Sequence, residues 1–287
     1  MKKVFIVLIL SVFLSPLFGQ DTVQVQNVSK PVRITFGTGI LIENQTVATP
    51  YKGGIELEIH HRFSIIETYQ NLFGIYGSAN TRIGLNYGIT NKLMVGLGTT
   101  KDYQLQDIQW KYLILQQTED NKMPVSLSYY GNIVADLRKK DVFGPGEYRE
   151  IHRLSYFSQL IVAHKINKMF SVQVAPSMAY FNAVPLKSDS TAGYKNMNFG
   201  LSAGLRANLF GAHSLILEYD QLLTRQDLDV QPKPNLAFGW EIGTGTHTFQ
   251  IFATNYNQII SQRNLVFNTN YYRGGGYLIG FNITVRF

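Results

Sequence analysis

Segments in which apolar and polar side chains alternate fill the sequence from residue 53 to residue 287. A period of two residues is typical of a β-strand with two unlike faces. No stretch has a convincing helical period, so we expect few helices. The alternation predicts about twelve strands, at residues 53–63, 81–89, 93–100, 105–115, 125–137, 154–166, 170–181, 198–209, 214–223, 236–242, 248–255 and 277–287. Most are close to the ~9–11 residues with which a tilted strand crosses a membrane.

The most regular of these segments, YLIGFNITVRF, ends the chain. Every second residue from Tyr277 to Phe287 is apolar, and those between are mostly small or polar. An open sheet edge cannot be exposed to lipid, so the last strand of a membrane barrel must pair with the first. We predict that this strand closes a barrel. Its outward residues Phe281, Ile283, Val285 and Phe287 resemble the signal by which the outer-membrane assembly machinery recognises its clients.

The connections between the predicted strands alternate in length. Every second connection is one of the short turns TNK, NK, FGAH and GTGTH or the medium-length QQTEDNKMP, and most of the others are long. In an antiparallel barrel every second connection lies at the same end, and outer-membrane barrels keep short turns on the periplasmic side. Both termini fall at the short-turn end. We therefore predict an all-β fold: a single antiparallel, up-and-down transmembrane β-barrel of about twelve strands.

The composition suits such a barrel. Only 16% of residues are charged, 13% are aromatic, and the mean hydropathy is -0.05, which excludes a protein of membrane-spanning helices. The absence of cysteine excludes disulfides, thiolate metal sites and a lipid anchor on an N-terminal cysteine. A soluble β-sandwich is the alternative, but aromatic residues on the apolar face near strand ends favour the interfacial girdles of a membrane barrel.

The first 52 residues divide into two parts. Residues 1–19 have a basic start, an apolar core and a breaker, so we predict a cleaved signal peptide and export to the outer membrane of a Gram-negative bacterium. Residues 20–52 are polar and form either a periplasmic extension or a lumen plug, and the barrel follows at 53–287. Without Lys2 and Lys3 the formal charge falls from +7 to +5, and we predict no nucleic-acid partner.

Several blocks resemble a known family. KGGIELEIHHRF, NTRIGLNYGITNKLMVGLG, MPVSLSYYG, RLSYFSQLIVAHKINKMFSVQVAPS and GTHTFQIFATN are similar to recurrent blocks of an uncharacterised family of Gram-negative outer-membrane β-barrel proteins. The resemblance covers residues 53–287. It implies a barrel in the outer membrane, and it supplies no activity, substrate or catalytic residue.

The polar face of the predicted strands carries most of the charged residues. In a barrel that crosses lipid this face lines the lumen. The predicted lumen-lining residues are Glu56, Glu58, His60, Arg62, Arg82, Asp107, Lys111, Asp136, Arg206, Glu218, Glu241 and Arg286. They form either a wall of paired charges, because an unpaired buried charge is costly, or a path for a solute or ion. We expect neither a metal site nor a cofactor.

A catalytic constellation is not evident. GLSAG, residues 200–204, matches the nucleophile-elbow pattern formally, but it lies inside a predicted strand with Ser202 facing the lumen. His61 and His164 have no serine at a suitable spacing for an interfacial membrane hydrolase, so we predict that the protein is not an enzyme.

We predict that the protein passes or binds a small solute or ion through a narrow charged lumen. The alternative is an occluded barrel that acts as an anchor or binds a partner through its long external loops, for which the apolar loop 64–78 is a candidate. That loop could instead fold over the mouth. The expected partners are outer-membrane lipid, the barrel-assembly machinery and a small solute.

Overall fold

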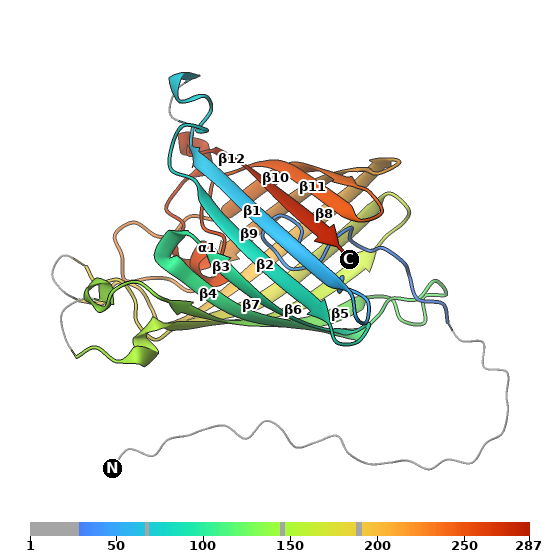
Figure 1. Ribbon diagram of the computed structural model, residues 1–287, viewed down its shortest axis with the longest axis horizontal. Helices are drawn as coiled ribbons and strands as arrows, with labels where there is room; N and C mark the ends of the chain where they lie inside the picture. Colours follow the sequence, from blue (N-terminus) through green and yellow to red (C-terminus); the bar gives the residue numbers. More distant parts are fainter. Residues whose placement is uncertain (1–28, 67–68, 144–146, 188–190) are drawn as a thin grey trace, which may run out of the picture.

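The chain folds as a closed antiparallel barrel (Figure 1). The computed structural model describes residues 29–66, 69–143, 147–187 and 191–287. Within these ranges each strand pairs with its neighbours in sequence, and the last pairs with the first. The strands are β1 (Ile55–Ile65), β2 (Asn80–Gly88), β3 (Leu93–Thr100), β4 (Leu105–Leu115), β5 (Ser126–Asp136), β6 (Leu154–Lys165), β7 (Phe170–Phe181), β8 (Met197–Phe210), β9 (His213–Leu222), β10 (Asn235–Gly243), β11 (His247–Thr254) and β12 (Leu278–Arg286). The predicted transmembrane barrel of twelve strands is confirmed.

The seam between β1 and β12 closes the sheet. Leu57 lies opposite Val285 and Ile59 opposite Ile283. At the end of the seam the Ile55 amide donates to the Phe287 carbonyl at 3.2 Å, and the Phe287 amide donates to the Ile55 carbonyl at 2.9 Å. The final residue is therefore tied to the first strand. Recognition of the outward side chains of β12 by the assembly machinery stays a prediction.

The two ends of the barrel differ in the length of their connections. One end has the short turns 89–92, 166–169, 211–212 and 244–246 together with the medium connection 116–125. The opposite end has the connections 66–79, 101–104, 137–153, 182–196, 223–234 and 255–277. The first residue of β1 and the last residue of β12 lie at the short-turn end. The predicted signal peptide, residues 1–19, lies outside the described residues.

The outer surface of the barrel is apolar. Outward-facing side chains such as Leu97 and Ile251 are 61% and 63% exposed, as expected where lipid rather than protein covers them. The β1–β2 connection projects beyond the barrel (Figure 1), and its Phe73 and Tyr76 side chains are exposed. The described part of this loop therefore does not cover the mouth.

Helix is confined to the long connections. The helix α1 (Ser261–Phe267) lies between β11 and β12, where the sequence pattern predicts only a loop. Seven residues are too few for a helix that is stable alone, so packing must hold α1 in place. In the described ranges, no helix is long and apolar enough to cross a membrane, a result that concerns helices alone. Short 3₁₀ turns occur at Tyr69–Asn71, Asp102–Gln104, Lys140–Phe143, Glu150–Arg153 and Tyr272–Gly274.

Inward-facing glycines make room for charged side chains, which gives a test of the packing. A Cβ atom at Gly98 would overlap both the Arg82 guanidinium and the Asp107 carboxylate. We expect Gly98→Val to lower the free energy of unfolding by about 1–3 kcal/mol, the usual cost of overpacking. Urea unfolding of the refolded protein in detergent, followed by heat-modifiable gel migration, measures this. Gly245→Val, in a turn with open space around it, is the control. Equal stability of the two variants would contradict the inward placement of Gly98.

Candidate functional site

The polar wall of the lumen surrounds the candidate site. All twelve charged residues predicted to line the lumen lie on inward-facing strand positions. Ten of them are buried, and Arg206 and Arg286 are half-buried. Whether they form a path for a solute stays a prediction. The wall also carries neutral polar residues, including Asn132, Gln173, Gln250 and Asn282.

Most of the charges are paired along the wall and not across the lumen, either between strands that are close together in the sheet or, for Arg138 and Asp136, at the end of one strand. The pairs are Arg82 with Asp107 (2.7 Å) and Glu58 (3.3 Å), Arg206 with Glu241 (2.7 Å), Arg286 with Glu56 (3.0 Å) and Arg138 with Asp136 (2.6 Å). His60 lies beside Glu58, with 3.7 Å between Nε2 and Oε2. Glu218, Arg62 and Lys111 instead contact a segment that enters the lumen from outside the sheet.

That segment is residues 36–47, here called the hairpin. The Leu41 amide donates to the Asn44 carbonyl at 2.8 Å, and the Thr46 amide donates to the Gly39 carbonyl at 2.9 Å. These bonds make a tight turn whose tip is at Ile42 and Glu43. The hairpin enters from the short-turn end, next to the start of β1 (Figure 1), and nearly all its residues are buried. Of the two placements that the sequence leaves open for residues 20–52, this part lies inside the barrel.

The carboxylate of Glu218 on β9 holds the tip of the hairpin. Its Oε2 accepts hydrogen bonds from three consecutive backbone amides, those of Ile42 (3.2 Å), Glu43 (2.9 Å) and Asn44 (2.8 Å). Its Oε1 accepts a hydrogen bond from the hydroxyl of Tyr256, at 2.7 Å. Consecutive amides that converge on one point form an anion-binding nest. The fully buried carboxylate of Glu218 is therefore stabilised by hydrogen bonds, and among the described residues no cationic side chain forms an ion pair with it.

Two residues at the β1–β12 seam also bind the tip. The Ile42 carbonyl accepts hydrogen bonds from Asn282 Nδ2 (2.7 Å) and from Arg62 Nη2 (3.3 Å). Arg62 Nη2 also lies 3.2 Å from Glu43 Oε2, and the guanidinium stacks 4.5 Å from the centroid of the Phe252 ring. The tip is therefore fixed from β9 and also from β1 and β12.

The arms of the hairpin are held through their backbone carbonyls. The fully buried Lys111 Nζ donates to the carbonyls of Gly39 (2.7 Å) and of Ala48 (3.0 Å), the residue that follows the hairpin. Three further donors bind arm carbonyls: Gln173 to Gln45 (2.9 Å), Gln250 to Ile40 (3.3 Å) and Arg286 to Gly37 (2.8 Å). The polar residues of the wall thus bind the hairpin mainly through its backbone and less through its side chains.

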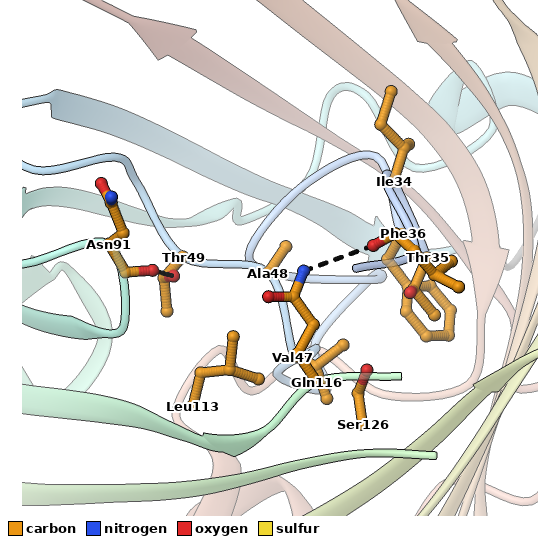
Figure 2. Close-up of a pocket in the computed structure, with 11 residues that line it drawn as sticks. Ile34, Thr35, Phe36, Val47, Ala48, Thr49, Asn91, Leu113, Gln116 and Ser126 are labelled. Atoms are coloured by element: carbon orange, nitrogen blue, oxygen red, sulfur yellow. Dashed lines mark hydrogen bonds between the residues drawn. The ribbon is translucent and has the colours of Figure 1, made fainter. Parts of the chain in front are cut away.

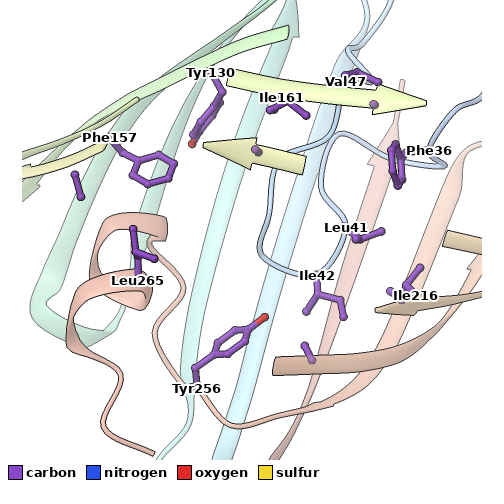
Figure 3. Close-up of a cluster of buried hydrophobic side chains, with 14 of the residues drawn as sticks. Phe36, Leu41, Ile42, Val47, Tyr130, Phe157, Ile161, Ile216, Tyr256 and Leu265 are labelled. Atoms are coloured by element: carbon purple, nitrogen blue, oxygen red, sulfur yellow. The ribbon is translucent and has the colours of Figure 1, made fainter. Parts of the chain in front are cut away.

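The apolar side chains of the hairpin form a core inside the lumen (Figure 3). Phe36, Leu41, Ile42 and Val47 belong to one buried cluster with residues of the wall that include Ile161 and Ile216. At the short-turn end, Phe36 and Val47 border a cavity of about 270 Å³ (Figure 2). Burial of these side chains supplies a hydrophobic contribution to docking that the polar contacts lack.

The long-loop end of the lumen is filled by the β11–β12 connection. Gln262 of α1 donates to Asn132 Oδ1 (2.9 Å) and to Ser155 Oγ (3.2 Å), and Leu265 packs into the same core as the hairpin. Tyr256, from the start of this connection, belongs to the same buried cluster (Figure 3), and its hydroxyl donates a hydrogen bond to Glu218. Glu218 is thus hydrogen-bonded to both segments that fill the lumen, the hairpin and the β11–β12 connection.

Two small cavities lie where the hairpin approaches α1. One is bordered by His60, Arg82 and Asp107, and the other by Ser177, Ser202 and Asp220. Each has a volume of about 10 Å³, which is room for about one water molecule. Neither of these two cavities can hold a solute larger than water.

Burial shifts the pKa of two groups that lie outside the strands. It raises the pKa of Tyr256 well above the ordinary value, so the phenol remains a hydrogen-bond donor to Glu218. Burial also raises the pKa of Glu43 well above its usual range, although the Arg62 guanidinium acts in the opposite direction.

The serine and histidine residues that the sequence offers as catalytic candidates occupy the following positions. Ser202 is buried within β8 and faces the lumen, so GLSAG is part of a strand and not a sharp strand-to-helix turn. His164 Nδ1 lies 2.7 Å from the Pro124 carbonyl. Among the described residues, no group of three or more His, Cys, Asp or Glu side chains is placed to hold a metal ion.

Sequence reasoning missed the neutral residues that hold the hairpin. Gln173, Gln250 and Asn282 fall on the inward face by alternation, but their partners are backbone groups of the hairpin. Tyr256 and α1 lie in a segment that resembles an external loop. The sequence signal for a buried segment was the adjacent apolar pair Ile259 and Ile260, both of which are buried in the structure.

Comparison with known proteins agrees with this architecture. A family model described as "Membrane bound beta barrel domain (DUF5777)" matches residues 36–287, a range that begins at the first residue of the hairpin. No curated relative matches the sequence.

Two solved structures are similar in fold at low sequence identity. The NanC porin is 9% identical, with a TM-score of 0.50, and the match covers 81% of this chain and 98% of the porin. An outer membrane channel from Pseudomonas putida F1 is 13% identical, with a TM-score of 0.51, and the match covers 84% of this chain and 97% of the channel. At such identities the likeness establishes the fold.

The amide nest predicts a specific effect of neutralising Glu218. The chain has no cysteine, so a single Leu41→Cys reports the exposure of the buried hairpin by its rate of maleimide labelling. In this background we expect Glu218→Gln to raise the rate about tenfold or more, because hydrogen bonds to a buried charge are lost. Asp107→Asn is the control, since that carboxylate binds Arg82. A larger effect of the control than of Glu218→Gln would contradict the role of the nest.

Proposed function

The chain belongs to the family of membrane bound beta barrel domains (DUF5777). We propose that it is an outer-membrane channel that binds and passes a small solute when its hairpin moves. The hairpin is the gate in this proposal. The arrangement of short turns at one end and long connections at the other supports an outer-membrane position with the hairpin on the periplasmic side. Export by a cleaved signal peptide at residues 1–19 is part of the same proposal.

The charged wall is the observation that carries the proposal. A lumen that is permanently filled is more simply stabilised by apolar residues, because burying charges costs free energy that pairing only partly recovers. This barrel instead buries six carboxylates and three cations on the inward faces of β1, β2, β4, β9 and β10, namely Glu56, Glu58, Asp107, Glu218, Asp220 and Glu241 with Arg62, Arg82 and Lys111. Such a wall is suited to contact with water and a polar solute.

The contacts of the hairpin also suit a movable element. Many of its fixing contacts are hydrogen bonds from wall side chains to its backbone, which water can replace when the hairpin leaves. No step in this function requires a catalytic group, and we propose a non-enzymatic role.

A second candidate function is an occluded barrel that anchors the long external loops or presents them to a partner. The filling of the lumen from both ends favours it. The two candidates differ in one respect: the channel needs the hairpin to move, and the anchor does not.

A reversible lock on the hairpin tests the gate. Asn44 Nδ2 and Asp220 Oδ1 are 2.6 Å apart, so cysteines at these two positions can be joined by a short bis-thiosulfonate crosslinker. In planar bilayers we expect the unlocked protein to give discrete conductance steps, the crosslinked protein to give none, and reductant to restore them. Because the natural chain has no cysteine, crosslinker added to it is the control. Silence of the natural protein across salts and voltages would contradict the channel, and unchanged steps after crosslinking would contradict the gate.

Selectivity provides a separate test of the wall. Glu58 is buried beside the Arg82 pair and has no hydrogen bond to the hairpin among those observed in the described structure. We expect Glu58→Gln to shift the reversal potential in a salt gradient towards anion preference, because one negative lumenal charge is removed. Glu150→Gln, on the exposed long-loop end, is the matched control. An identical reversal potential in both variants would place the permeation path away from Glu58.

A further inference from the structure

A larger cavity than the three described above opens at the long-loop end of the barrel, separate from the lumen contacts of the hairpin. Its volume is about 620 Å³, within the range of about 300–1,000 Å³ that is typical of small-molecule sites. It is bordered by Tyr103 after β3, by the end of β5, by the connection after β7, and by Arg263 and Phe267 of α1. We call this cavity the vestibule.

Arg263 is the central cation of the vestibule. Its guanidinium carbon lies 3.7 Å from the centroid of the Tyr103 ring and 5.1 Å from that of Phe267. Among the described residues, no carboxylate lies within 4.0 Å of it; its Nε donates a long hydrogen bond to Gln258 Oε1 at 3.4 Å, and its side chain also hydrogen-bonds Tyr103. Burial lowers the pKa of Arg263, although Tyr103 and Asp136 act in the opposite direction. A half-buried guanidinium without an ion-pair partner is a ready ligand for an anion.

The charge of the vestibule is positive. Arg138 is paired with Asp136, and it stacks on the same Tyr103 ring as Arg263, with 4.5 Å between guanidinium carbon and ring centroid. Lys187 borders the cavity from the connection after β7. Three cations therefore face one carboxylate among the lining residues, and the cavity attracts anions.

Aromatic rings form the remaining wall. The Phe267 ring centroid is 4.9 Å from that of Phe181 and 4.9 Å from that of Tyr194. All three rings border the cavity. Clustered rings supply apolar area and flat faces on which another ring can stack. The Arg263 guanidinium and the Phe267 ring, which contacts the other two rings, lie on the same helix, so one ligand can contact both.

We propose that the vestibule binds a small organic acid in which a carboxylate is attached to a ring. Arg263 binds the carboxylate, whose planar fork matches the guanidinium, and Phe267 with its neighbouring rings binds the ring body. This ligand site goes beyond the proposed channel, because it does not require the lumen to conduct.

Naphthoate and its neutral amide test the proposal on the complete protein. Equilibrium dialysis against protein in lipid nanodiscs, with empty nanodiscs as the blank, gives the affinity of each probe. We expect naphthoate to bind saturably and naphthamide to bind about tenfold or more weakly, because the amide lacks the charge that Arg263 binds. Equal affinity of the two probes, or no saturable binding of naphthoate at millimolar concentration, overturns the proposal.

Variants assign the site. Arg263→Gln is expected to weaken naphthoate binding about tenfold or more and to leave the weak binding of naphthamide unchanged. Arg149→Gln, an exposed arginine that pairs with Glu147 outside the vestibule, is the matched control and keeps full affinity. Heat-modifiable gel migration verifies that each variant is folded. If Arg263→Gln retains full affinity for naphthoate, the site is elsewhere. If Arg263→Gln does not fold, the comparison of the two probes on the natural chain decides the question.

Discussion

The closed state of the barrel depends on the buried carboxylate of Glu218. A charge removed from water is tolerated only where hydrogen bonds replace its hydration. Here three hairpin amides occupy one oxygen and the Tyr256 hydroxyl occupies the other. Because those donors come from the N-terminal hairpin and from the β11–β12 connection, one side chain joins two segments that enter the lumen from opposite ends.

The other contacts in the lumen are consistent with this arrangement. Lys111 and Arg62 donate hydrogen bonds to hairpin carbonyls, whereas Arg82, Arg206 and Arg286 form ion pairs with carboxylates of the wall. The hairpin therefore satisfies only part of the wall, and the ion pairs of Arg82 and Arg206 are made within the wall itself. This difference suits the movable hairpin that we propose. The vestibule adds a ligand site on α1, the element that fills the opposite end.

The sequence predicted the barrel well and its contents poorly. Strand limits agree within one or two residues, because the alternation required by a sheet with lipid on one face and polar groups on the other is visible in every strand. Inward placement of the charged residues follows from the same period. The docking of the hairpin does not, because its partners are backbone amides and carbonyls, which carry no sequence signal. The helix α1 was missed because seven residues held by packing show no clear period.

The most direct test of the account is whether a change in the β11–β12 connection releases the hairpin. Tyr256→Phe removes one hydrogen bond to Glu218 and touches no hairpin amide, and Leu41→Cys labelling measures hairpin exposure. The account predicts faster labelling in Tyr256→Phe, and a combined Glu218→Gln and Tyr256→Phe variant whose effect is smaller than the sum of the two single effects, because both changes act on one carboxylate. An unchanged labelling rate in Tyr256→Phe would show that the two segments are independent and would contradict the account.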